Sequence, residues 1–338
     1  MTSLTIGNVS LDSPVILAPM SGVTDLPFRS LVKKFGAGLV ISEMIASEAM
    51  IRETRQSLKK CAHRIEEFPM AVQLAGCDPQ VMAEAARLNV DRGAQIIDIN
   101  MGCPVKKVVN GHAGSALMKD EYKASKIMEA TVNAVKIPVT LKMRMGWDDN
   151  SLNAPKLAKI AENCGIKMIT IHGRTRCQLY NGQANWPFIK TVKEAVKIPV
   201  VGNGDVKTVE DARSLLDESS ADAVMIGRGT YGRPWFLNQV NTFLKTGKKL
   251  ADPSLRDQKE TILEHFEQTL IHYGEETGIL LMRKHLGWYS KGLPNSADFR
   301  VRINTSQTRK DVLNFLNQYY ESIEADSTFS LQNKEIIF

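Results

Sequence analysis

The sequence predicts a (β/α)₈ barrel followed by a small helical domain. Three observations predict it: the chain has 338 residues, short apolar runs alternate with helical patterns eight times, and the alternation stops near residue 245. A barrel of this kind takes about 250 residues, so the length leaves room for an appendage. We therefore expect a barrel domain over residues 1–244 and a helical domain over residues 245–338.

Eight short apolar runs, most of them followed by Gly, Pro, Asn, Asp or Ser, are the expected barrel strands. A run without helical periodicity is typical of a strand buried on both faces of a parallel sheet. The runs are residues 15–20, 39–44, 71–75, 96–100, 139–144, 168–172, 200–203 and 223–226. A short hairpin is expected before them, over residues 4–12.

Helical patterns separate these runs. After the first run, Thr24 or Asp25 can cap a helix that has Pro27 in its first turn. Two later connections share the hexapeptide AVKIPV, at 134–139 and 195–200, in which Pro ends a helix just before a strand. An open doubly wound sheet is the alternative fold, but its Gly-x-Gly-x-x-Gly turn is absent after the first run.

Amphipathic helices without strands between them are expected behind the barrel, over residues 259–273, 280–289 and 308–320. Charge is concentrated there: the chain has a net charge of +6, and residues 283–310 hold seven basic residues against one acid. This basic segment contains Arg283, Lys284, Lys291, Arg300, Arg302, Arg309 and Lys310, with Trp288, Tyr289 and Phe299 between them. Such a pattern is typical of binding to RNA or DNA, although a solvated basic face explains the charges equally well.

The composition favours a cytoplasmic protein. The five cysteines are scattered and never form Cys-x-x-Cys, which argues against a disulfide framework or a zinc site. No apolar run approaches the roughly 20 residues of a membrane span, and the polar start at residues 1–5 lacks the parts of a signal peptide. We expect a monomer that binds no metal and no membrane.

The residues that follow the strands form the expected site, because all strand carboxyl ends of a barrel open on one face. They are Pro19, Met20 and Ser21; Glu43; Gln73; Asn100 and Cys103; Lys142 and Arg144; His172 and Arg174; Asn203, Gly204 and Asp205; and Gly227, Arg228 and Gly229. Each has a structural explanation when taken alone, since buried inert Cys and exposed Lys are common. The whole set is explained better by a functional site.

Two Gly-rich turns after the last strands predict a phosphate site. The turns at residues 202–205 and 227–229 expose backbone N–H groups, and Arg228 adds a charge-assisted hydrogen bond. The phosphate can belong to a sugar-phosphate substrate or to FMN. Lys142 favours FMN, because a fixed cation beside the pyrimidine end of a flavin stabilises the anionic reduced ring.

Six segments resemble the bacterial tRNA-dihydrouridine synthases, most closely the B subgroup. They are residues 18–25 (APMSGVTD), 98–104 (DINMGCP), 141–144 (LKMR), 171–176 (IHGRTR), 202–205 (GNGD) and 225–228 (MIGR), and the match extends to residues 283–285 (RKH). The occurrence of all six in one order makes the resemblance specific. Ser21 departs from the family, which more often has Ala there, and the loop at residues 110–112 varies among members.

The resemblance implies an FMN enzyme that reduces a uridine of tRNA, in the D-loop for the B subgroup, to 5,6-dihydrouridine with NADPH. FMN would be bound by Pro19, Met20, Ser21, Gln73, Lys142, Asn203, Gly204, Asp205, Gly227 and Arg228. The uracil would be bound by Asn100, Arg144, His172 and Arg174. Hydride would reach C6, and Cys103 would be the acid that protonates C5 from the opposite side. An ordinary thiol is largely protonated at neutral pH, which suits that role.

The resemblance also implies that the target base is turned out of the tRNA and that the helical domain holds the tRNA. NADPH, or NADH, and tRNA would take turns at one flavin face, which predicts ping-pong kinetics. Three alternatives stay open: a flavin barrel that acts on a free pyrimidine, as in dihydroorotate oxidation; a tRNA-binding protein whose chemistry is dispensable; and a phosphosugar enzyme.

Overall fold

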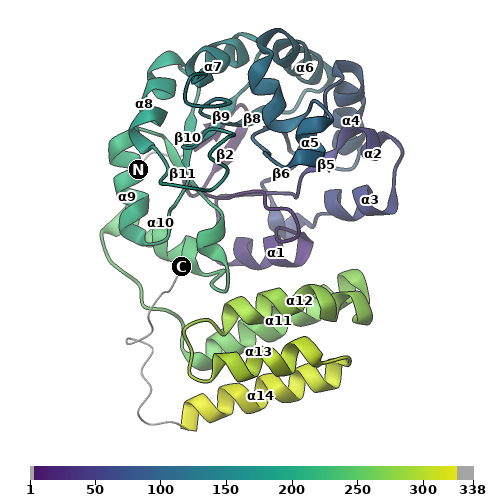
Figure 1. The fold of residues 1–338 in the computed structure, drawn as a ribbon, viewed down its shortest axis with the longest axis vertical. Coiled ribbons are helices and arrows are strands. Elements are labelled where there is room, and N and C mark those ends of the chain that lie inside the picture. The colour runs from purple at the N-terminus through teal and green to yellow at the C-terminus, as the bar shows by residue number, and fades with distance from the viewer. Residues whose placement is uncertain (1–3, 326–338) are drawn as a thin grey trace.

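The computed structural model describes residues 4–325 and consists of a barrel with a bundle of helices beside it (Figure 1). The polar start at residues 1–3, and residues 326–338 of the predicted helical domain, lie outside the described residues. The barrel strands are β3 (Val15–Leu17), β4 (Leu39–Ile41), β6 (Met70–Ala75), β7 (Ile96–Met101), β8 (Val139–Arg144), β9 (Met168–His172), β10 (Val200–Asn203) and β11 (Ala223–Ile226). All pair in parallel, and the pairings of β3 with β11 and of β4 with β6 close the ring. The predicted (β/α)₈ barrel is confirmed.

The barrel interior is filled by apolar side chains from the strands. Ile16, Leu39, Ile96 and Val201 belong to this inner cluster and are fully buried. The predicted hairpin is present as β1 (Leu4–Ile6) and β2 (Val9–Leu11), and its apolar side chains join the same cluster. The hairpin therefore adds to the barrel core and leaves the opposite, carboxyl ends of the strands for a site.

Two strands are shorter than predicted because polar loop contacts begin early. After β3, the Met20 N–H donates to the Thr24 hydroxyl at 2.9 Å. After β4, the Ser42 hydroxyl accepts the N–H of Gln73 at 3.0 Å and donates to the Glu43 carbonyl at 3.0 Å. A two-residue strand, β5 (Ile45–Ala46), follows and pairs with the end of β6.

Helices surround the barrel. They are α1 (Leu26–Lys34), α4 (Pro79–Asp91), α6 (Glu121–Ala134), α7 (Ala154–Asn163), α8 (Trp186–Ala195), α9 (Val209–Ser219) and α10 (Phe236–Thr246), with the short α2 (Ser47–Ile51), α3 (Arg55–Cys61) and α5 (Lys106–Asn110) in the loops. The start of α1 follows its sequence, because the Asp25 side chain accepts the Phe28 N–H and Pro27 stands in the first turn.

Four helices form the bundle: α11 (Leu255–Tyr273), α12 (Glu275–Tyr289), α13 (Ser296–Thr305) and α14 (Arg309–Ala325). They bury a core of their own that includes Phe266, Met282 and Tyr320. Because α10 continues to Thr246, we propose the connection at 247–254 as the place where the two domains divide. Within residues 4–325, no helix combines the length and the apolar character that crossing a membrane requires.

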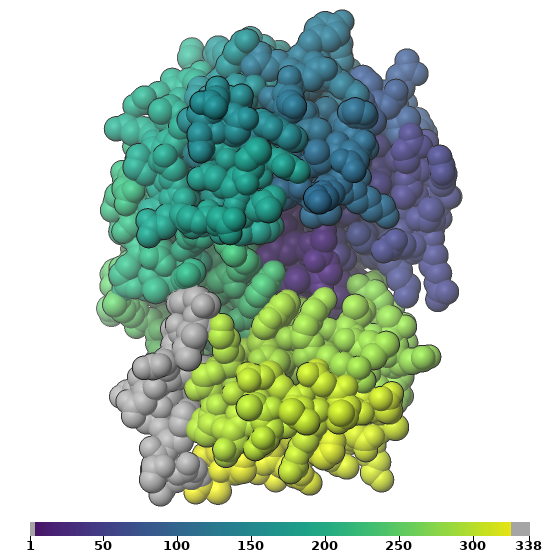
Figure 2. Space-filling model, in the orientation of Figure 1, coloured from purple at the N-terminus to yellow at the C-terminus, as the bar shows by residue number. Residues whose placement is uncertain are grey.

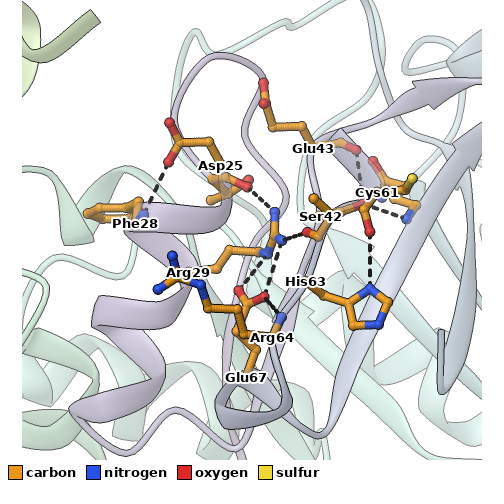
Figure 3. A network of polar contacts seen from close by, with 12 residues as sticks. Asp25, Phe28, Arg29, Ser42, Glu43, Cys61, His63, Arg64 and Glu67 are labelled. Carbon is orange, nitrogen blue, oxygen red and sulfur yellow. Dashed lines mark hydrogen bonds and ion pairs between the residues drawn. The ribbon is translucent and has the colours of Figure 1, made fainter. Parts of the chain in front are cut away.

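A buried ion pair anchors α1 and the loop before it (Figure 3). Arg29 and Glu67 are both inaccessible to solvent, and the Arg29 Nε lies 3.0 Å from the Glu67 Oε1. Arg29 also donates to the carbonyls of Thr24 at 2.9 Å and Ala62 at 2.7 Å. Since the Thr24 hydroxyl binds the Met20 N–H, this cation supports the loop that follows β3.

Candidate active site

A cavity of about 440 Å³ opens at the carboxyl ends of the barrel strands. Of the predicted site residues, all but Glu43 and Arg174 line it: Pro19, Met20, Ser21, Gln73, Asn100, Cys103, Lys142, Arg144, His172, Asn203, Gly204, Asp205, Gly227, Arg228 and Gly229. Its volume is in the range typical of cofactor and ligand pockets. The strand ends therefore converge as the sequence predicted.

Cys103 is held in the cavity wall by contacts on both sides of its loop. The Asn100 Oδ1 accepts the N–H groups of Gly102 at 3.2 Å and Cys103 at 2.9 Å. The Cys103 carbonyl accepts the N–H and the hydroxyl of Ser115, at 3.1 and 2.9 Å. Arg144 Nε donates to the Gly102 carbonyl at 2.8 Å. The half-buried thiol is thus carried by a fixed backbone.

Asp98 supports the candidate site from within β7, and no pattern in the sequence singled it out. It is fully buried in β7 and accepts the Gln73 Nε2 at 2.7 Å and the Thr140 hydroxyl at 2.6 Å. Burial raises the pKa of Asp98, although these two donors and Lys142 act in the opposite direction. Because the Gln73 amide nitrogen points to Asp98, its oxygen is free to accept Asn100 Nδ2 at 2.8 Å. Asp98 therefore orients the side chain that holds the Cys103 loop.

Two cations from β8 give the cavity a positive potential. The Lys142 Nζ donates to the Asn203 Oδ1 at 3.1 Å. Burial and the adjacent Arg144 lower the pKa of Lys142 to about 8, and burial lowers the pKa of Arg144 to about 10. Both side chains are therefore mainly charged at neutral pH. Arg144 also donates to the carbonyls of Thr175 and Leu179, which joins the loop after β9 to the Cys103 loop.

His172, at the end of β9, is neutral at neutral pH. Burial, followed by the charges around it, lowers its pKa well below the ordinary value. The charges are those of Lys142, Arg144, Arg174 and Arg228. Its Nε2 lies 3.3 Å from the Arg174 Nη1, which can only donate. This assigns the ring proton to Nδ1.

Arg174 lies behind the cavity wall, not in it. It is almost fully buried and donates to the carbonyls of Asn181 at 3.0 Å and Gly182 at 2.7 Å. It also pairs with Asp205 at 2.5 Å. Burial by itself raises the pKa of Asp205, but the hydrogen bond from Arg174 and that from the Ala184 N–H bring it below its ordinary value. Arg174 thus positions His172 and Asp205, while its predicted contact with the uracil stays a prediction.

Two tyrosines also line the cavity and were missed from the sequence. The Tyr180 ring lies 4.7 Å from the Arg228 Cζ and 5.6 Å from the Arg144 Cζ, so two cations meet its face. The Tyr231 ring stacks on Trp288 of α12 with centroids 4.0 Å apart. Both tyrosines stand in loops without periodicity, so no local pattern distinguishes them.

A family model described as "Dihydrouridine synthase (Dus)" matches residues 16–324, almost the whole described chain. The chain belongs to the dihydrouridine synthase family. It is 59% identical over 319 residues to a probable tRNA-dihydrouridine synthase of Rickettsia bellii, covering 94% of this chain and 98% of that protein. It is 50% identical to a protein of Xanthomonas axonopodis pv. citri and 44% identical to one of Pseudomonas aeruginosa, covering 95% and 97% of this chain and 96% and 99% of theirs. Both are named tRNA-dihydrouridine synthase B, which supports the B subgroup.

An old yellow enzyme homologue from Zymomonas mobilis shares the barrel fold of this dihydrouridine synthase family member. It superposes with a TM-score of 0.51 at 16% identity, over 77% of this chain and 94% of that one. At this identity the similarity concerns the fold alone.

The chemistry of the cavity fits a ligand that carries a phosphate, as a flavin mononucleotide does. The Gly204 backbone has φ +129°, and a Cβ there would lie 2.6 Å from the Ala184 Cβ and 3.1 Å from the His172 ring. A Cβ at Gly227 would lie 3.3 Å from the Met20 sulfur. Glycine is therefore needed at Gly204, whereas a Cβ at Gly227 would require only a small shift of the Met20 side chain. Arg228, beside both turns, offers a half-exposed guanidinium. Backbone turns with an adjacent cation are typical phosphate sites of this fold.

For an FMN site at these turns, we expect Gly204→Ala to weaken FMN binding, since the new Cβ clashes with Ala184 and the positive φ disfavours any side chain. The FMN dissociation constant should rise at least about tenfold, which corresponds to roughly 1.4 kcal/mol of the strain expected at such a position. It is measured by titrating the apoprotein with FMN. The control is Gly247→Ala, where φ is +74° but the space around the Cβ is open. Equal FMN affinity in both variants would contradict the assignment.

Proposed function

We propose that this chain reduces a uridine in the D-loop of tRNA to 5,6-dihydrouridine, with FMN as cofactor and NADPH as reductant, in the cytoplasm. The observation that carries the proposal is the geometry of Cys103. Its loop is fixed by Asn100 and Arg144 in the same cavity as Lys142 and the Gly-rich turns, in a chain of the dihydrouridine synthase family. No group of three metal-binding side chains occurs among residues 4–325.

The residues proposed for FMN line the cavity at the ends of the first, third, fifth and last two strands. They are Pro19, Met20, Ser21, Gln73, Lys142, Asn203, Gly204, Asp205, Gly227 and Arg228. When bound, FMN supplies a hydride, which it receives from NADPH, to C6 of the uracil. Lys142 and Arg228 provide the positive charge that an anionic phosphate and an electron-rich ring require.

The side chains of this chain complete the reduction. Cys103 donates its proton to C5 of the uracil, on the face opposite to the one that accepts the hydride, and the thiolate regains a proton from water. Negative charge that develops on the uracil O4 is stabilised by the positive potential of Lys142 and Arg144. The neutral His172 can donate its Nδ1 proton to a uracil carbonyl. Asn100 acts by positioning, because its amide already binds Gln73 and the Cys103 loop.

A second cavity, of about 400 Å³, suits the tRNA backbone. This basic groove lies on the bundle and is lined by Arg283, Lys284, Gly287, Trp288, Lys291, Arg300 and Asn304. Four of the seven cations of the basic segment are therefore gathered at one place, as phosphate binding requires. Arg309 instead pairs with Glu267 at 2.9 Å. Between the barrel and the bundle the surface is hollowed, with the purple N-terminal part of the chain at its base (Figure 2).

The test is nucleoside mass spectrometry of tRNA from a strain that lacks this gene and related synthases. Dihydrouridine should be absent, and the wild-type gene should restore it. Purified enzyme with NADPH should modify a tRNA transcript at the D-loop and leave free uridine and uracil unchanged. Turnover of free pyrimidine without tRNA modification would favour the free-pyrimidine alternative. Protein purified without flavin absorbance, and unable to bind added FMN, would favour a phosphosugar enzyme.

Lys142 gives a pH prediction for flavin reduction by NADPH. Because the pKa of Lys142 is lowered to about 8, its ammonium is present below that pH and is lost as the pH rises through it. The reduction rate should fall by up to roughly tenfold per pH unit above 8, since the anionic reduced ring loses its cation. Stopped-flow absorbance measures this step, and the Cys103→Ala background removes the thiol from the profile. In Lys142→Arg the reduction rate should fall less steeply above pH 8, because guanidinium stays charged. A pH profile equal to that of the wild type would contradict the proposed role of Lys142.

A further inference from the structure

Helix α12 contacts both the basic groove and the loops of the candidate flavin cavity. In Figure 1, α11 and α12 are the bundle helices on the barrel side. Lys284 and Trp288 are four residues apart on α12, so they share one face of the helix. Both line the basic groove, and each also touches a barrel loop.

Lys284 reaches the loop after β3. Its ammonium donates to the Gly22 carbonyl, while the Glu43 carboxylate accepts the Gly22 N–H from the other side. Gly22 has φ +76° and directly follows Ser21, which lines the cavity. Burial lowers the pKa of Lys284, and the carboxylates of Asp25 and Glu43 act against this fall. The Gly22 peptide is thus held between the barrel and the bundle.

Trp288 reaches the loop after β11. Its ring stacks on Tyr231, with an angle of 10° between the planes, and Tyr231 lines the cavity. The next residue, Gly232, has φ +70°, and a Cβ there would lie 2.2 Å from the Trp288 carbonyl oxygen. Since β3 and β11 are neighbours in the barrel, α12 spans two adjacent loops that carry predicted FMN residues.

We propose that α12 couples the two cavities: RNA in the basic groove fixes Lys284 and Trp288, and these fix the loops after β3 and β11 in the conformation that binds FMN. The inference rests on the proposed function, because it takes the groove as an RNA site and the cavity as an FMN site. When RNA binds first, it orders the loops after β3 and β11, so FMN then binds at a smaller cost in conformational entropy. By linkage, FMN strengthens RNA binding by the same factor.

The experiment measures the FMN dissociation constant of the full-length apoprotein with and without saturating RNA. The RNA probe is a tRNA transcript whose D-loop uridines are replaced by cytidine, so that no uracil enters the cavity. In the wild type, RNA should lower the FMN dissociation constant about tenfold, which is a typical coupling. The quantity compared between variants is the ratio of this constant without RNA to the constant with RNA. In Lys284→Met the ratio should fall to about one, and Lys284→Arg should restore it because a donor is retained.

The matched control is Lys291→Met. Lys291 lines the same groove, but within residues 4–325 its side chain makes no hydrogen bond to either loop. This variant should bind RNA more weakly and keep the tenfold ratio once RNA is saturating. Hydrogen exchange supplies a second readout: RNA should slow exchange at Gly22 and Tyr231 in the wild type, and less so in Trp288→Leu.

The outcomes separate the inference from the proposed function. If the wild type binds both ligands with a ratio near one, or if Lys284→Met keeps the wild-type ratio, the coupling is wrong and the proposed function stands. If the wild type binds FMN but no tRNA, or tRNA but no FMN, the proposed function fails and the inference fails with it. Loss of the ratio in Lys284→Met alone supports the inference.

Discussion

Replacing Cys103 by alanine is expected to stop dihydrouridine formation while FMN and tRNA still bind. The thiol is the group in the cavity wall that we assign to protonation of C5, and removing a general acid costs typically 10²–10⁴-fold in rate. The backbone of its loop is fixed by Asn100 and Ser115, so the cavity should keep its shape. The measurement is single-turnover reduction of an unmodified tRNA transcript by prereduced enzyme, quantified by nucleoside mass spectrometry.

Cys77→Ala is the matched control for this prediction. Cys77 is also a half-buried thiol that follows a barrel strand, but it lines a separate cavity beside α2 and α5. We expect wild-type turnover from it. A Cys103→Ala enzyme that forms dihydrouridine at the wild-type rate would rule out the thiol as the acid. A variant that restores the biological role without dihydrouridine would favour a tRNA-binding protein whose chemistry is dispensable.

The barrel could be predicted from local patterns because each strand is buried on both faces. Four strands, β8 to β11, begin and end at the predicted residues. In the bundle, α12 was predicted to begin at residue 280, but it begins at Glu275. The first turn was not predicted because it contains Gly278, and glycine is a poor helix former. It stands there because a Cβ would lie 2.6 Å from Leu270, so the close approach of α11 and α12 requires it. Helix α13 was missed because it buries only Phe299 and Ile303.

The lining of the candidate site could be predicted, but its supporting contacts could not. Strand ends converge in any barrel, so residues such as Lys142 and Asn203 were placed together without knowledge of contacts. The contacts of Asp98 and Arg174 depend on partners that only the fold selects, and Arg174 follows a strand yet does not line the cavity. Gly22 and Lys284 are separated by 262 residues, and no local pattern links them.

The buried pair of Arg29 and Glu67 gives the largest expected effect on stability. Glu67→Gln leaves the Arg29 cation buried without its counterion, and breaking such a pair costs about 3–5 kcal/mol. The free energy of unfolding in urea measures this change. The control is Glu264→Gln, which removes an exposed partner of Lys34 at 2.7 Å and should cost less than about 1 kcal/mol. Similar losses in the two variants would contradict a dominant role for the buried pair.

A double variant separates the charge of this pair from its support of the loop after β3. Arg29→Met with Glu67→Leu removes both charges, so much of the stability lost in Glu67→Gln should return. It does not restore the hydrogen bonds that Arg29 donates to the carbonyls of Thr24 and Ala62. Because Thr24 holds the Met20 N–H, FMN affinity in the double variant should be lower than in the wild type although the barrel is stable. Wild-type FMN affinity in the double variant would show that the loop after β3 keeps its shape without Arg29.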